Sequence, residues 1–106
     1  MLDRVKREYD KLDARTRAGL VRKMNTWAKE QPLPDTHFKF EWRVPVDGKA
    51  IGVYAFKDNQ ARLYGATFPL NGKETFICSE IDSAKKQNKA DQEKLKRAAL
   101  NLRGFL

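Results

Sequence analysis

The chain has 106 residues, 41% of them hydrophobic, which is enough for one ordinary core but leaves no reserve for a second. A single cysteine and a single histidine exclude an internal disulfide and the common zinc-binding spacings. The net charge of +8 and the pI near 9.8 favour a polyanionic partner, which is nucleic acid, the ribosome, an acidic protein or an acidic membrane surface. We therefore expect one basic domain over residues 1–106.

The same composition predicts a cytoplasmic protein. No apolar run approaches the roughly 18 residues that span a bilayer. The first ten residues, MLDRVKREYD, are charged throughout and lack the apolar region of a secretory leader. A lone cysteine fits a reducing compartment.

Residues 2–30 predict two helices, arranged as a hairpin, because apolar side chains recur at spacings of three and four. Asp13 is the expected cap of the second helix, and Pro32 and Pro34 end it. The residues with this spacing are Leu2, Val5, Tyr9 and Leu12 in the first helix, and Leu20, Met24, Trp27 and Ala28 in the second.

The middle of the chain predicts four strands. Strict alternation over residues 37–46 indicates a half-buried strand with one apolar face, formed by Phe38, Phe40, Trp42, Val44 and Val46. Three further strands are expected at 50–57, 61–70 and 73–81. The pairs Asp47-Gly48, Asp58-Asn59 and Asn71-Gly72 lie between the strands, and such pairs favour tight hairpin turns. The segments therefore predict an antiparallel meander.

After a linker at 82–89, residues 90–103 predict a final helix, with Gly104 as its C-terminal cap. The linker holds Lys85, Lys86 and Lys89, with no acid among them. Helices that are segregated from an antiparallel sheet define an α+β domain. The expected fold is thus an N-terminal helical hairpin, a four-stranded antiparallel meander and a C-terminal helix.

This order of elements resembles the RelE/ParE superfamily of toxins from toxin–antitoxin modules, with the closest likeness to its HigB-like, phage-derived branch. The matching pieces are ARLYGATF at 61–68, NGK at 71–73, TFICSEI at 75–81 and KKQNKADQEKLKRA at 85–98, together with the helical segment at 9–28. The sequence departs from the family pattern at Ala61, where a tyrosine is frequent, and at Ser79, where a histidine is frequent.

The resemblance implies a RelE-like fold and a toxin that cleaves messenger RNA on the ribosome while a cognate antitoxin holds it inactive. Cleavage of this kind uses the ribose 2′-hydroxyl as nucleophile and needs neither metal nor cofactor. ParE members inhibit gyrase instead. Two alternatives therefore stay open: a non-catalytic RelE-fold protein of phage or prophage origin that binds nucleic acid or a protein, and a ParE-like gyrase inhibitor.

The resemblance and the chemistry together single out Arg62, which aligns with the strand arginine of the family. A guanidinium fork matches phosphate oxygens and stabilises developing negative charge. Tyr64 follows at i+2, on the same face of the expected strand. Lys57 is expected close to Arg62 across the turn. We predict catalytic roles for Arg62, Lys57 and Tyr64.

The lysine cluster of Lys85, Lys86 and Lys89 is predicted to bind RNA or ribosomal phosphates by releasing counterions. Lysines with an ordinary pKa are poor bases, so docking suits them better than proton transfer. Glu80, Asp82 and His37 are the available proton acceptors, although the two acids more simply screen nearby lysines. Cys78 is expected to be a small buried hydrophobe.

Overall fold

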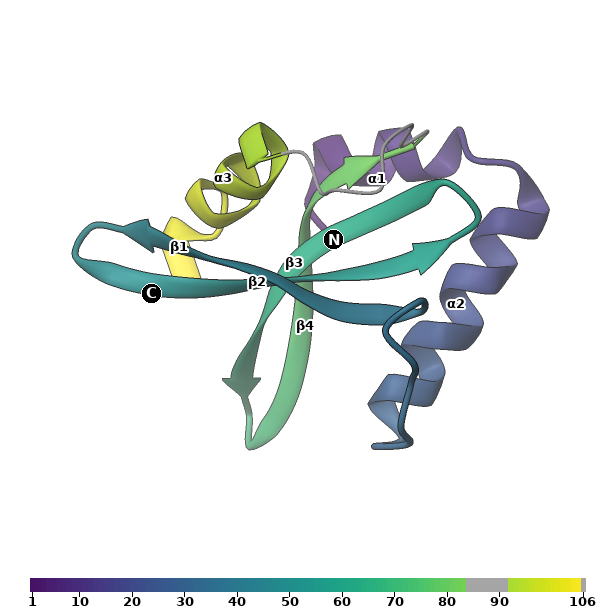
Figure 1. Cartoon of the computed structure of the whole chain (residues 1–106), viewed down its shortest axis with the longest axis horizontal. Helices are drawn as coiled ribbons and strands as arrows, with labels where there is room; N and C mark the ends of the chain where they lie inside the picture. Colours follow the sequence, from purple (N-terminus) through teal and green to yellow (C-terminus); the bar gives the residue numbers. More distant parts are fainter. Residues whose placement is uncertain (84–91, 106) are drawn as a thin grey trace.

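The computed structural model describes residues 1–83 and 92–105 (Figure 1). Its elements are α1 (Asp3–Asp10), α2 (Ala14–Ala28), β1 (Phe38–Val46), β2 (Lys49–Asp58), β3 (Ala61–Leu70), β4 (Lys73–Asp82), α3 (Gln92–Leu100) and a 3₁₀ turn, η1 (Arg103–Phe105). The strands form one antiparallel sheet in the order β1-β2-β3-β4. The predicted α+β class and the antiparallel meander are confirmed. The lysine cluster lies outside the described residues.

Two of the predicted turn pairs make hairpins of the expected kind. Asp47 and Gly48 have φ values of 51° and 80°, and Asn71 and Gly72 have 51° and 78°. Positive φ at both central residues defines the type I′ turn, whose twist matches that of the flanking strands. These turns fix the antiparallel pairing of β1 with β2 and of β3 with β4.

The sheet separates two apolar clusters. Helices α1 and α2 cover one face, where Val5 and Leu20 pack against Phe56 and Leu63. Helix α3 covers the other face, where Leu95 and Leu102 contribute to the second cluster. In Figure 1, α2 and α3 lie at opposite ends of the view. The fold thus has three layers, with the sheet between the helices.

A bulge in β1 corrects the predicted alternation. The register shifts between Phe40 and Trp42, so that Glu41 is the additional residue. Phe38 therefore lies on the face of α1 and α2, whereas Trp42 and Val44 lie on the face of α3. The prediction that all apolar residues of this strand share one face is wrong, because one inserted residue inverts every side chain beyond it.

A second bulge lies between β3 and β4, where Tyr64 pairs with Glu80 but Gly65 pairs with Cys78. The strands approach closely here, and a Cβ on Gly65 would overlap the Ile77 carbonyl oxygen. The additional residue, Ser79, is fully buried and donates a hydrogen bond of 2.7 Å from Oγ to the Ala98 carbonyl of α3. The bulge therefore anchors α3 to the sheet.

Two smaller predictions about helix ends need correction. Helix α3 ends at Leu100, and Gly104 lies in η1 instead of capping that helix. Asp13 occupies the N-cap position of α2, but its side chain makes no capping hydrogen bond. No helix in residues 1–83 and 92–105 has the length and apolar character needed to cross a membrane.

Candidate functional site

The sheet register brings two of the predicted catalytic residues face to face. Lys57 on β2 lies directly opposite Arg62 on β3, so the predicted proximity of the two is confirmed. Tyr64 pairs with Ala55, which belongs to the cluster beneath α3, and Arg62 shares this face because it lies two residues away. The three side chains thus share one face of the sheet. Their catalytic roles stay predictions.

Lys57 is engaged in an ion pair. Its Nζ lies 3.2 Å from Glu41 Oε1, and the side chains are only 16% and 11% exposed. The backbone carbonyl of Lys57 accepts a hydrogen bond from Lys23 Nζ, which also pairs with Asp58. Lys57 is therefore held in place on both its side chain and its main chain.

The guanidinium of Arg62 closes the turn between β2 and β3. Its Nη1 donates to the carbonyl oxygens of Asn59 and Ala61, each at 3.0 Å. Its Nε is buried and has no hydrogen-bond partner. Arg62 as a whole is only partly buried, so these contacts orient the fork without removing it from solvent.

Tyr64 is the most enclosed of the predicted site residues that the structure describes. Its side chain is 0% exposed and belongs to the cluster that packs against α3. A tyrosine in this position gives packing area and a buried hydroxyl. RNA in solvent does not reach that hydroxyl in this structure.

Glu41 is a site residue that the sequence did not single out. Plain alternation assigned it to the solvent face, whereas the bulge turns it toward Lys57. The resulting group of Glu41, Lys57, Arg62, Tyr64 and Asp82 is called the Arg62 cluster below. Asp82 belongs to it because it lies opposite Arg62 on the other neighbouring strand. No feature of the sequence marks the bulge.

The predicted alternative proton acceptors differ in their surroundings. Glu80 is 2% exposed, and its Oε2 lies 3.1 Å from Arg4 of α1 and 3.6 Å from Arg97 of α3. It therefore joins helices on the two faces of the sheet. Whether it also screens the linker lysines stays a prediction, because those lysines lie outside the described residues. His37 directly precedes β1, and its backbone carbonyl accepts a hydrogen bond of 2.8 Å from the backbone amide of Lys57.

Cys78 is buried, as predicted. Loss of solvent around the thiol raises its pKa from 9.0 to about 12. A thiol of this kind stays protonated at neutral pH and is a poor nucleophile. Among the described residues, no group of three or more histidine, cysteine or acidic side chains is suited to hold a metal ion.

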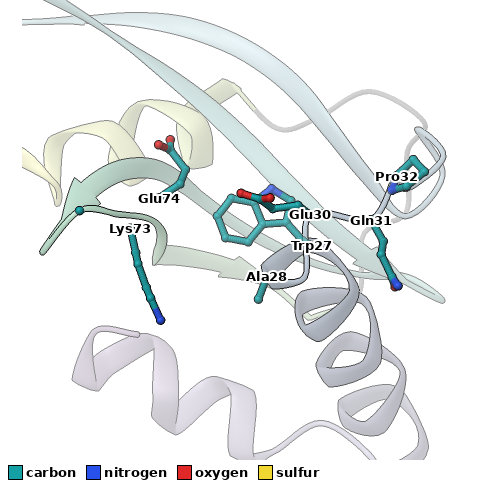
Figure 2. Close-up of a pocket in the computed structure, with 8 residues that line it drawn as sticks. Trp27, Ala28, Glu30, Gln31, Pro32, Lys73 and Glu74 are labelled. Carbon is teal, nitrogen blue, oxygen red and sulfur yellow. The ribbon is translucent and has the colours of Figure 1, made fainter.

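A groove of about 580 Å³ runs between the end of α2 and the start of β4. Figure 2 shows the indole of Trp27 between Glu30 and Gln31 on the helix side and Lys73 and Glu74 on the strand side. Trp27 also contacts Phe38, Phe56 and Phe76, so it packs against the apolar cluster on the face of α1 and α2. The groove contains two carboxylates and one ammonium, a poor combination for a polyanion.

No family model, no curated protein and no solved structure matches this chain.

Proposed function

We propose that the chain is a RelE/HigB-like toxin that cleaves messenger RNA on the ribosome and is neutralised by a cognate antitoxin. The single observation that carries the proposal is the pairing of Arg62 with Lys57 on one sheet face, with Glu41 at 3.2 Å from the Lys57 Nζ. Two cations and a carboxylate at one place are the groups that metal-free RNA cleavage requires.

In the proposed reaction, the ribose 2′-oxygen forms a bond to phosphorus while the bond to the 5′-oxygen breaks. One proton leaves the 2′-hydroxyl and one reaches the departing 5′-oxygen. Arg62 is assigned to the phosphate, since its fork suits the charge that grows on the equatorial oxygens. Glu41 is assigned to the first proton, and Lys57 holds that carboxylate in position.

The substitution Arg62→Ala tests this assignment. We expect it to abolish growth arrest on induction and to lower the rate of mRNA cleavage by about 10²-fold or more, by analogy with removal of one charge-stabilising donor. Loss of the two turn hydrogen bonds should lower the free energy of unfolding by only about 1 to 2 kcal/mol. Thermal unfolding followed by circular dichroism checks that the variant is folded.

The exposed Arg22 of α2 gives a matched control, because Arg22→Ala removes the same charge from a residue outside the Arg62 cluster. It should leave growth arrest intact. Arg62→Lys keeps the charge and loses the fork, so intermediate activity is expected. A fully toxic Arg62→Ala protein would show that the site is assigned wrongly.

A second candidate function is binding without cleavage. The observation that favours it is the burial of Tyr64 together with the Lys57–Glu41 ion pair, because both reduce what the cluster offers to a substrate. Under this alternative the protein binds RNA or ribosomes, yet mRNA stays intact for the parent and for Arg62→Ala alike. The same induction experiment, read as mRNA integrity, separates the two functions.

A further inference from the structure

The face of the sheet that α1 and α2 cover is not covered along its whole length. In Figure 1 the β1–β2 hairpin extends away from α2. Near the start of β1, Phe40 is 42% exposed, although it is a large apolar side chain. A shallow cleft of about 310 Å³ lies beside it, lined by residues that include Arg43, Gly52, Tyr54 and Thr67. Phe40 and these four residues are called the open sheet patch below.

The two rings of the patch meet above a glycine. The Phe40 and Tyr54 ring centroids are 5.4 Å apart, at an interplanar angle of 75°. A Cβ on Gly52 would lie 3.3 Å from Phe40 and 3.7 Å from Tyr54, so the missing side chain lets both rings settle close to the strand. Phe38 stacks on Tyr54 with centroids 5.3 Å apart and supports it from the side. The Tyr54 ring therefore lies between Phe38 and Phe40.

The charge of the patch is positive and unopposed. Arg43 lies directly opposite Gly52 in the register and is exposed. Among residues 1–83 and 92–105, it is the single charged residue that lines the cleft. No ion pair within the described part of the chain involves Arg43. A guanidinium without a carboxylate partner is available for an anion.

We infer that the open sheet patch binds a segment of single-stranded RNA, with a base against the Phe40 and Tyr54 rings and a phosphate on Arg43. Rigid aromatic side chains on a sheet, with an arginine beside them, are suited to unpaired bases, whose faces are accessible only outside a duplex. The inference deepens the proposed function, since it rests on RNA as the ligand. It assigns one residue of this positively charged protein, Arg43, to a phosphate on the face opposite the Arg62 cluster.

The test uses the full chain and a fluorescently labelled single-stranded RNA of about 10 nucleotides, with binding followed by anisotropy. Phe40→Ala should weaken binding roughly 5- to 100-fold, because stacking against an aromatic ring contributes that much per base. Phe40→Tyr keeps the ring and should bind like the parent. The RNA in duplex form should bind with no dependence on Phe40, because its bases are already stacked.

Val21→Ala is the matched control. Val21 is also a large apolar side chain, 42% exposed, but it lies on α2 and does not line the cleft. Its removal should leave the affinity unchanged. A Phe40→Ala protein that binds RNA as tightly as the parent would overturn the inference, and this is the result expected if the patch binds a protein partner. Equal losses for Phe40→Ala and Val21→Ala would overturn it too.

Arg43 gives a second, independent measurement. Arg43→Ala should reduce the slope of log K against log salt by about 0.7, the share of one phosphate contact on a single strand. Arg22→Ala, which removes the same charge from α2, should change the slope less. Equal slopes for the parent and Arg43→Ala would contradict the phosphate contact.

The two proposals fail separately. Binding of the oligonucleotide needs neither ribosomes nor cleavage, so a Phe40-dependent affinity in a protein that never cuts mRNA would support the patch and overturn the nuclease. Loss of mRNA cleavage in Arg62→Ala, with RNA affinity insensitive to Phe40, would support the nuclease and overturn the patch.

Discussion

At the scale of single residues, burial decides the chemistry of Cys78. Its raised pKa means that the folded protein disfavours the thiolate. The contribution of the protonated thiol to the free energy of unfolding is fully present below pH 9, the ordinary pKa of the thiol. It is lost as the pH rises through about 12. The thiol therefore contributes to alkaline unfolding, and near neutral pH it stays protonated within the buried cluster.

Alkylation kinetics check this directly. We expect iodoacetamide to modify Cys78 in the native protein at pH 8 at least about 100-fold more slowly than in denaturant, because few thiolates are present and the sulfur is enclosed. Cys78→Ala should raise the onset of alkaline unfolding measured by circular dichroism. Rapid labelling of the native protein would mean that this strand is open to solvent.

Single residues also show where sequence reasoning succeeds. The partnership of Lys57 with Arg62 was predictable, since a short turn between two strands forces their adjoining ends together. The contact of Glu41 with Lys57 was not, because the residues around the bulge keep an unbroken alternation in the sequence. In the sequence, apolar residues that lie on opposite faces before and after the bulge give the same alternation as one regular strand.

At the scale of elements, the sequence predicted each strand to within about one residue at each end, since turn pairs with obligatory positive φ mark the boundaries. It was weaker at helix ends. Leu102 continued the apolar spacing of the last helix, but it lies beyond the end of α3 and is fully buried there. Packing, not helical periodicity, places that leucine.

Glu80 connects the elements at the edge of the sheet. Its carboxylate accepts hydrogen bonds from Arg4 of α1 and the amide of Ile81, while Arg97 of α3 lies 3.6 Å away. We expect Glu80→Ala to lower the free energy of unfolding by about 2 kcal/mol, because it leaves the buried Ile81 amide without its carboxylate acceptor. The two arginines are half exposed, so their loss of a partner adds little. Urea denaturation measures the difference.

Glu8→Ala provides the control for this experiment. Glu8 also forms an ion pair, with Lys11 at 3.4 Å, but at a more exposed position on α1. Its removal should change the free energy of unfolding by no more than about 0.5 kcal/mol. Equal effects of the two substitutions would show that Glu80 does not join the helices.

At the scale of the whole molecule, the sheet presents different chemistry on its two faces. The Arg62 cluster lies on the face of α3 and contains acids as well as bases. The open sheet patch lies on the other face and contains rings and a lone guanidinium. The net charge indicated a polyanionic partner, but it could not show which charged residues lie on which face of the sheet. The division depends on the bulge in β1, which the sequence does not reveal.

Mapping of mRNA 5′ ends after induction directly tests whether the Arg62 cluster cleaves mRNA. We expect new 5′ ends inside translated coding regions for the parent and for Arg22→Ala, and their disappearance in Arg62→Ala at equal protein levels. Intact mRNA with trapped DNA breaks would instead indicate inhibition of gyrase. Identical new 5′ ends in the parent and in Arg62→Ala would show that Arg62 takes no part in cleavage.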